Sequence, residues 1–310
     1  MENSTESVIQ VRDLVKRFGS VTAVDGISFD VCRGEIFGIL GPNGAGKTTT
    51  LETIEGLLSP TSGAILVLGV ETHRHPERVK ERIGIQLQAS AYFDYLTLRE
   101  ILALFGGFYP RHIDPDELLA RVGLTDKRDT TLAKLSGGQK QRFTIAASLV
   151  NDPELVILDE PTTGLDPQAR RHLWEFIQEI HGGGKTVVLT THYMEEAQFL
   201  CHRVAIMDMG KIVALDTPMN LIRGLEAPYQ IKLEASAPLD VSGLQGLEGV
   251  KGAISSDGAR YALRASDASR VVPALLQLAS SQGAAVAHLE VVPATLEDVF
   301  LALTGKQLRD

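Results

Sequence analysis

The sequence contains little cysteine and no long apolar run. Cys32 and Cys201 are the only two cysteines, and each adjoins an apolar segment. This placement favours small buried thiols in a reducing compartment over a disulfide or a metal site. No apolar run approaches the ~18 residues of a membrane-spanning helix, and residues 1–7 are polar without the apolar core of a signal peptide. We therefore expect a cytoplasmic protein that reaches a membrane only through a partner.

Basic charge is also scarce. The formal net charge is −9, and no long basic run is present, which argues against nucleic acid as the main partner. The chain has 310 residues, 44% of them hydrophobic, which is enough for one large domain with a small one or for two domains.

A glycine-rich segment follows an apolar strand pattern at residues 36–40 and precedes a helical pattern at residues 47–58. It reads G-x-x-x-x-G-K-T, the phosphate-binding loop of nucleoside triphosphatases. Its glycines let backbone N–H groups wrap a phosphate at a helix N-terminus. A glycine-rich turn with a surface lysine is the alternative, which the strand-to-helix position disfavours. The predicted nucleotide-binding residues are Gly41, Pro42, Asn43, Gly44, Ala45, Gly46, Lys47 for the β- and γ-phosphates, Thr48 for Mg²⁺, and Thr49.

Two further apolar strands end in polar residues. Residues 155–158 lead into Asp159 and Glu160, whose side chains should point in opposite directions because they are adjacent in a strand. One could reach Mg²⁺ through its water shell and the other an attacking water, although a surface acidic pair is the alternative. Residues 186–189 lead through two threonines to His192. A lone histidine is usually structural, so both interpretations of His192 remain open.

Three other features have modest meaning when taken singly. Ser136 is a good N-cap before two glycines and an apolar helix, which is either a second anion-binding helix end or an ordinary cap. Phe18 could stack on a purine, although a core position is favoured by sequence alone. Strands at residues 8–18, 27–31 and 64–68 predict a small β-subdomain, and residues 89–134 predict a helical insertion with a capping box that starts at Thr97.

The order of these motifs resembles that of the nucleotide-binding subunits of ABC transporters. The phosphate loop, the segment Leu135-Ser136-Gly137-Gly138-Gln139, the pair Asp159-Glu160 and His192 follow one another, and the resemblance covers residues 8–224. It implies an α/β P-loop NTPase core of the ABC ATPase type, with an antiparallel β-subdomain and a helical subdomain at about residues 89–150.

The resemblance also implies roles for single residues. Phe18 would stack on adenine in place of the usual tyrosine, and Gln88 would sense Mg²⁺ and the nucleophilic water and relay contact to the membrane subunit. Asp159 would be the Walker B acid beside Mg²⁺, Glu160 the catalytic base and His192 a contact of the γ-phosphate. The dimer interface would involve Asp166, in the loop that crosses it, and Ser136, Gly137, Gly138 and Gln139, which would cap the partner's nucleotide.

Residues 225–310 predict a separate small α+β domain, with residues 1–224 as the ATPase domain. The segment 293–301 resembles the tail of drug-resistance ATPases of the daunorubicin-exporter kind. In the first domain, His202 stands where the family often has aspartate, from which we expect no catalytic consequence.

These features together predict an ATP- and Mg²⁺-dependent ATPase that powers a two-component exporter of drug, antibiotic or lipid-like cargo. The permease would be a separate chain that holds the ATPase at the inner face of the membrane, and a homodimer would sandwich two ATP molecules. The alternatives are an ABC-type ATPase that acts on ribosomes or DNA, and an importer ATPase.

Overall fold

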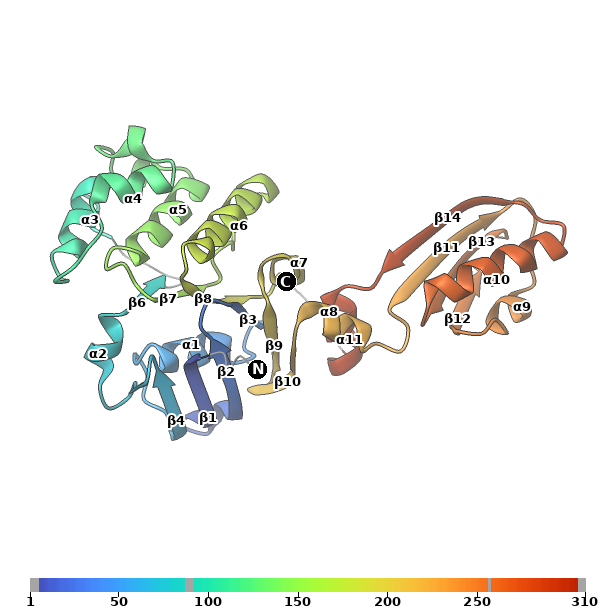
Figure 1. Cartoon of the computed structure of the whole chain (residues 1–310), viewed down its shortest axis with the longest axis horizontal. Coiled ribbons are helices and arrows are strands. Elements are labelled where there is room, and N and C mark those ends of the chain that lie inside the picture. The colour runs from blue at the N-terminus through green and yellow to red at the C-terminus, as the bar shows by residue number, and fades with distance from the viewer. Residues whose placement is uncertain (1–5, 87–91, 256–257, 306–310) are drawn as a thin grey trace. The chain divides into compact units, whose positions relative to one another are not determined.

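The computed structural model describes residues 6–86, 92–255 and 258–305. The chain divides into two compact units, the first ending at Asp216 and the second beginning at Thr217 (Figure 1). Helix α8 (Pro218–Arg223) belongs to the second unit because it packs against α11 (Leu296–Thr304). The predicted boundary after residue 224 therefore lies too late, since the sequence does not reveal this contact between distant helices.

The first unit is built on a six-stranded sheet with the order β10-β9-β3-β8-β7-β6. Neighbouring strands from β9 to β6 are parallel, and β10 runs antiparallel to β9 at the edge. The strands β3, β7 and β8 are buried along their whole length, as expected for a parallel sheet covered on both faces. The strands are β3 (Ile36–Leu40), β6 (Ile83–Gln86), β7 (Leu155–Asp159), β8 (Thr186–Thr191), β9 (Arg203–Asp208) and β10 (Lys211–Asp216).

A four-stranded antiparallel sheet, in the order β2-β1-β4-β5, forms the predicted β-subdomain. Its inner side chains share one apolar core with β3 and α1. In this core the rings of Phe29 and Phe37 stack with their centroids 5.4 Å apart. The elements are β1 (Ser7–Phe18), β2 (Val21–Cys32), α1 (Lys47–Ile54), β4 (Ser62–Val67) and β5 (Val70–Glu71).

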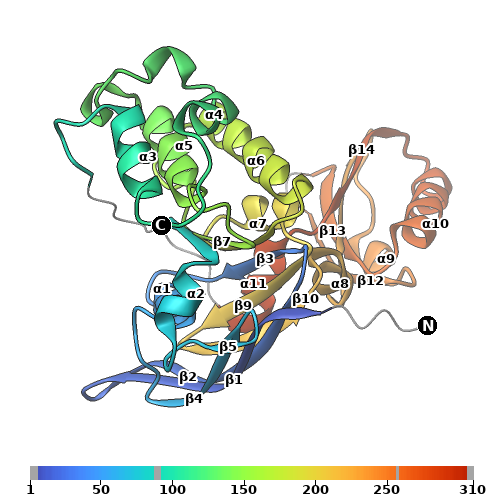
Figure 2. The ribbon, with the colours of Figure 1, turned by 60° about the vertical axis from the view of Figure 1, so that its left-hand side comes forward.

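Helices form the rest of the first unit. Figure 2 shows α3, α4 and α5 gathered on one side of β7, away from β1, β2 and β4. The predicted capping box is present, because Thr97 accepts from the Glu100 N–H and donates its own N–H to the Glu100 carboxylate. The helices are α2 (Pro76–Lys80), α3 (Leu98–Gly106), α4 (Pro115–Arg121), α5 (Gly137–Ser148), α6 (Pro167–Gly182) and α7 (Met194–Leu200), with 3₁₀ turns at Thr125–Lys127 and Leu132–Lys134.

The second unit has the chain order β-α-β-β-α-β and an antiparallel sheet with the order β12-β13-β11-β14. This is the ferredoxin-like arrangement. Helices α9 and α10 cover one face, where Leu244 and Leu275 pack with Ile231 and Leu263. The elements are β11 (Tyr229–Ala235), α9 (Val241–Gln245), β12 (Val250–Ser255), β13 (Arg260–Ala265), α10 (Ala268–Ser281) and β14 (Val286–Pro293).

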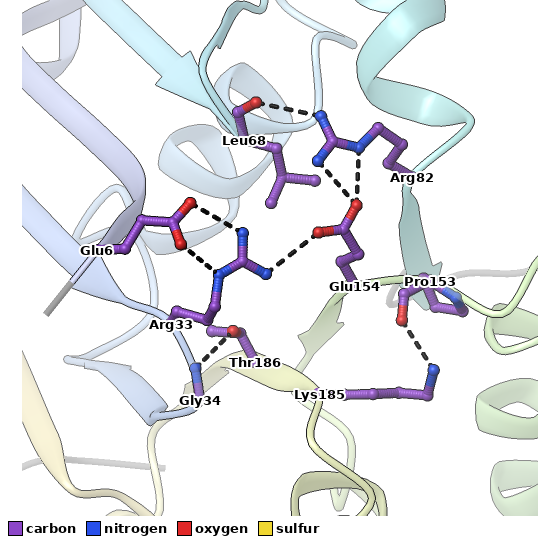
Figure 3. Close-up of polar contacts among 9 residues, drawn as sticks. All are labelled: Glu6, Arg33, Gly34, Leu68, Arg82, Pro153, Glu154, Lys185 and Thr186. Atoms are coloured by element: carbon purple, nitrogen blue, oxygen red, sulfur yellow. Dashed lines mark hydrogen bonds and ion pairs between the residues drawn. The ribbon is translucent and has the colours of Figure 1, made fainter.

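An ion-pair network joins the amino ends of the parallel strands to the β-subdomain (Figure 3). Arg33, between β2 and β3, donates to both carboxylate oxygens of Glu6 and, at 3.1 Å, to Glu154. Arg82, before β6, donates to the same Glu154 at 2.8 Å and to the carbonyl oxygen of Leu68 at 3.1 Å. Partial burial raises the pKa of Glu154, but the hydrogen bonds from Arg82 and Arg33 outweigh it and hold that pKa below its usual value.

We expect Glu154→Gln to lower the free energy of unfolding by ~1 kcal/mol at pH 7, since exposed ion pairs contribute ~0.2–1 kcal/mol each. Because the pKa of Glu154 is lower in the folded chain, its contribution is complete above the unfolded pKa of ~4.3 and disappears as the pH falls through the folded value. Urea unfolding at pH 7 and pH 3.5 measures both effects.

The control for this prediction is Glu77→Gln. The Glu77 side chain is 83% exposed and meets only Lys80, at 3.5 Å. An equal loss of stability in both variants at pH 7, or a Glu154→Gln deficit that persists undiminished at pH 3.5, would contradict the prediction.

Candidate active site

The strand order brings three polar segments together. Strand β8 lies between β3 and β7, with Leu40 opposite Thr191 and Asp159 opposite Thr190. All three strands are parallel, so the segments that follow them emerge at the same edge of the sheet, where ligands bind in such sheets. The phosphate loop, the pair Asp159–Glu160 and His192 thus share one site.

The loop from Gly41 to Thr49 connects β3 to α1 and depends on glycine for its shape. Gly46 has φ +100° and is the N-cap of α1, and a Cβ atom there would overlap the carbonyl oxygen of Ala23. Gly44 has φ +81°, and a Cβ atom on Gly41 would overlap the carbonyl oxygen of Met207. Of the other loop residues, Ala45 is buried, Pro42, Thr48 and Thr49 are half-buried, and Asn43 is exposed.

The ammonium of Lys47 is held at the mouth of this loop. The side chain is 4% exposed, and Nζ donates to the carbonyl oxygens of Gly41 at 2.9 Å and Pro42 at 3.2 Å. Nζ also lies 3.3 Å from Oε1 of Glu160. A buried cation at the N-terminus of a helix suits the phosphates of a nucleotide.

Glu160 follows β7 and lies between the ammonium of Lys47 and the imidazole ring of His192. Its second carboxylate oxygen is 3.3 Å from Nδ1 of His192 and accepts from the Thr163 hydroxyl at 3.1 Å. Burial raises the pKa of Glu160, but the charges of Lys47 and His192 and the hydrogen bonds from Thr163 and Lys47 outweigh it, so the pKa lies below its usual value. The group is therefore an ionised carboxylate at neutral pH, able to orient water or accept its proton.

The backbone at Glu160 is unusual, since its φ of +46° lies in the left-handed region that non-glycine residues seldom adopt. Such conformations cluster at functional sites.

Asp159 faces different partners. Its Oδ1 accepts from the hydroxyl of Thr48 at 3.4 Å and from the hydroxyl of Thr190, which in turn accepts the N–H of Glu160 at 3.0 Å. Carboxylate and hydroxyl oxygens are ligands that Mg²⁺ prefers. The described residues contain no group of three or more acidic, histidine or cysteine side chains that could hold a metal. A Mg²⁺ ion at Thr48 and Asp159 would therefore complete its shell with phosphate oxygens and water.

The segment that begins at Ser136 lies in a separate pocket. Ser136 is the N-cap of α5 and forms a capping box with Gln139. Asp166 is the N-cap of α6 and accepts from the Ala169 N–H at 2.8 Å. Both line a pocket of about 380 Å³, and residues 41–49 do not contribute to its described lining. The pocket is formed by Ser136, Gly137, Gly138, Gln139, Arg142, Gly164, Leu165, Asp166, Ala169 and His172.

Phe18 is 48% exposed at the end of β1, so it is not the core residue that the sequence alone favoured. The ammonium of Lys16 lies 4.9 Å from its ring centroid. Gln88 lies outside the described residues. Both cysteines are free, Cys201 buried and Cys32 half-buried, and burial raises the pKa of the Cys201 thiol well above its usual value.

The sequence reasoning missed two polar residues of the site. Thr190 bridges Asp159 and the backbone of Glu160, and Thr163 donates to Glu160. For Thr190 the available signal was a threonine at the end of a buried strand, because a buried hydroxyl requires a hydrogen-bond partner.

Comparison with known proteins identifies the family. The chain is 39% identical to Nod factor export ATP-binding protein I of Paraburkholderia xenovorans (strain LB400), over 98% of this chain and 99% of the relative. It is 37% identical to linearmycin resistance ATP-binding protein LnrL of Bacillus subtilis (strain 168), over 98% of this chain and 100% of the relative. The family model described as ABC transporter matches residues 24–163.

The chain belongs to the ATP-binding subunits of ABC transporters. It is therefore an ATPase, and its α/β fold with antiparallel and helical subdomains is that of ABC ATPase cassettes, as predicted. Among solved structures, a dimeric ATP-binding cassette bound to ADP and Pi in a post-hydrolysis state superimposes with a TM-score of 0.62 at 26% identity, covering 67% of this chain and 98% of that chain. Among the described residues, no helix is both long and apolar enough to span a bilayer.

Proposed function

We propose that this ABC ATPase powers an exporter by binding and hydrolysing ATP at the site between β3, β8 and β7. The observation that carries the proposal is the ionised Glu160 between Lys47 and His192, at 3.3 Å from each. Export is supported by two relatives named for export and for drug resistance, both of which match this chain over 98% of its length.

The site residues divide the work of phosphoryl transfer, which depends on positioning and charge stabilisation. Lys47 and backbone N–H groups at the N-terminus of α1 hold the phosphates. Thr48 and Asp159 hold Mg²⁺, with Gln88 as the sensor of the metal and the water. The bound Mg²⁺ neutralises charge on the phosphate oxygens. Glu160 orients the attacking water and accepts its proton, and His192 contacts the γ-phosphate.

Two copies of the chain would form the complete sites. Ser136, Gly137, Gly138 and Gln139 line a pocket with Asp166 and away from residues 41–49, which suits a helix end that caps the γ-phosphate of a second copy. A homodimer would thus enclose two ATP molecules. In each copy the half-exposed ring of Phe18 would offer a stacking surface for the adenine of the bound ATP.

The partner in the membrane is a separately encoded permease that holds the ATPase at the inner face. We expect the full-length chain to remain in the high-speed supernatant when expressed alone, and to sediment with membranes when co-expressed with its permease. Quantitative immunoblotting of both fractions measures this partition. Stable sedimentation with membranes in the absence of any permease would contradict the proposal, and an unrelated membrane protein serves as the control partner.

A further inference from the structure

A buried carboxylate lies four residues after His192 in the sequence. Glu196, in the first turn of α7, is 0% exposed, and its Oε1 accepts from the indole N–H of Trp174 on α6 at 2.9 Å. Burying a carboxylate costs free energy unless hydrogen bonds and charges compensate for it. The side chains around Glu196 should therefore explain why a carboxylate is buried at this position.

Two of the side chains around Glu196 come from the segments that carry His192 and Glu160. Burial raises the pKa of Glu196, while the neighbouring side chains of Thr191 and Thr162, the hydrogen bond from Trp174 and the charge of Arg170 act in the opposite direction. The second carboxylate oxygen, Oε2, has no hydrogen-bond partner among the described residues. Thr191 immediately precedes His192, and Thr162 is two residues beyond Glu160. Both threonines are 1% exposed. One carboxylate is thus hydrogen-bonded to helix α6 and lies near the end of β8 and the loop after β7.

Helix α6 also contacts the His192 side chain indirectly, through Arg170 and Tyr193. Arg170 lies one turn before Trp174, so both face the same way, and its guanidinium lies 4.0 Å from the ring centroid of Tyr193. The Tyr193 ring is 4.1 Å from that of His192, whose Nδ1 points toward Glu160. The Tyr193 N–H donates to the Thr191 hydroxyl at 2.9 Å, so the backbone on both sides of His192 is held as well.

We propose that Glu196 is a positioning residue for ATP hydrolysis, whose buried carboxylate ties α6 to the first turn of α7, directly after His192, and so sets the orientation of His192 beside Glu160. The proposal rests on the role of His192 proposed above. An apolar side chain of similar volume would fill the same space without the cost of burying a charge. The carboxylate is instead explained by the hydrogen bond that it accepts from Trp174 on α6, which fixes the first turn of the helix that follows His192.

The first test compares Glu196→Ala and Glu196→Gln with the matched control Glu195→Gln. Glu195 is the adjacent residue in α7, and its side chain is exposed. Because a small misplacement of a catalytic group costs up to ~10²-fold in rate, we expect Glu196→Ala to lower kcat by ~10–100-fold while the KM for ATP stays within ~3-fold of wild type. Glutamine keeps an acceptor for the Trp174 N–H and should retain more activity than alanine. Glu195→Gln should match wild type.

The second test separates positioning of His192 from general stabilisation. Glu196→Ala is combined with His192→Ala in the full-length chain, and hydrolysis of radiolabelled ATP is measured with the thermal midpoint of each variant. If Glu196 acts through His192, its removal should add little to the loss caused by His192→Ala, because residues of one network are not additive. Trp174→Phe, which removes only the indole N–H donor, should give a smaller loss in kcat that is likewise absent when His192 is alanine.

The outcomes discriminate clearly. Multiplied losses in the double variant, a rise in KM that equals the fall in kcat, or a wild-type kcat in Glu196→Ala would overturn the positioning role. A wild-type kcat in His192→Ala alone would instead refute the proposed function of His192. If Glu196→Ala fails to fold, Glu196→Gln and Trp174→Phe in the same His192→Ala background decide the matter.

Discussion

Glu160→Gln should abolish turnover while leaving ATP and Mg²⁺ binding intact. Glutamine preserves the size of the side chain but cannot accept a proton from the attacking water, and the loss of a general base typically lowers the rate by ~10²–10⁴-fold. Lys47 remains hydrogen-bonded to the carbonyl oxygens of Gly41 and Pro42, so the phosphate loop should keep its shape. Phosphate release under saturating Mg-ATP measures turnover, and equilibrium titration measures binding.

The same substitution tests the dimer. Persistent ATP between two copies would shift the equilibrium toward the dimer, because a ligand that binds only one state stabilises it. Glu160→Gln with Mg-ATP should therefore elute as a dimer from size exclusion, and wild type with ADP as a monomer. Asp159→Asn is the comparison variant. Because Asp159 accepts from the hydroxyl of Thr48, this substitution should weaken Mg²⁺-dependent ATP binding instead. A wild-type rate in Glu160→Gln would refute its role as base, and an inactive variant that stays monomeric would refute the role of Ser136 in a second copy.

Lys47→Ala should weaken nucleotide binding itself. The ammonium is 4% exposed and is the buried cation beside the loop, so its loss deprives the phosphates of a charge-assisted hydrogen bond. Hydrogen bonds to charged groups contribute ~1.5–3 kcal/mol, which corresponds to a fall in ATP affinity of ~10–150-fold. Titration with a fluorescent ATP analogue measures this fall, and thermal unfolding verifies that the variant folds.

Lys211→Ala is the matched control for Lys47→Ala. Lys211 also forms an ion pair, with Asp25 at 3.3 Å, but its side chain is 63% exposed. The Lys211→Ala variant should therefore bind ATP with the affinity of wild type. Equal affinities of Lys47→Ala and wild type would show that the phosphates lie elsewhere and would also remove the basis for placing Glu160 beside the γ-phosphate.

Chain-local patterns were sufficient for much of the site. Residues 36–49 form a strand, a glycine loop and a helix because short-range hydrophobic periodicity and glycine placement define them. The apolar run before Asp159 and the cap at Ser136 were likewise visible from neighbouring residues and appear in the structure as β7 and α5. The order of these motifs along the chain was enough to identify the family.

Elements without a strong local pattern were missed. The run at residues 243–252 is rich in glycine and has no strong local pattern, yet it contains part of α9 and the start of β12, which belong to the ferredoxin-like unit. Strand β12 forms because it pairs with β13, and that pairing outweighs the weak β-propensity of its own residues. Helix α8 was assigned to the wrong unit for the related reason that α11, far along the chain, determines where it packs.

The sequence by itself determined the phosphate loop and the acidic pair, because each depends on neighbouring residues, and the order of these motifs along the chain determined the family. Only the tertiary structure decided that β8 lies between β3 and β7, which places His192 3.3 Å from Glu160. It also decided that Phe18 is half exposed, that Arg82 and Arg33 share Glu154, and that Trp174 bonds Glu196. These contacts join segments far apart in sequence, and they form only when burial of the whole sheet brings those segments together.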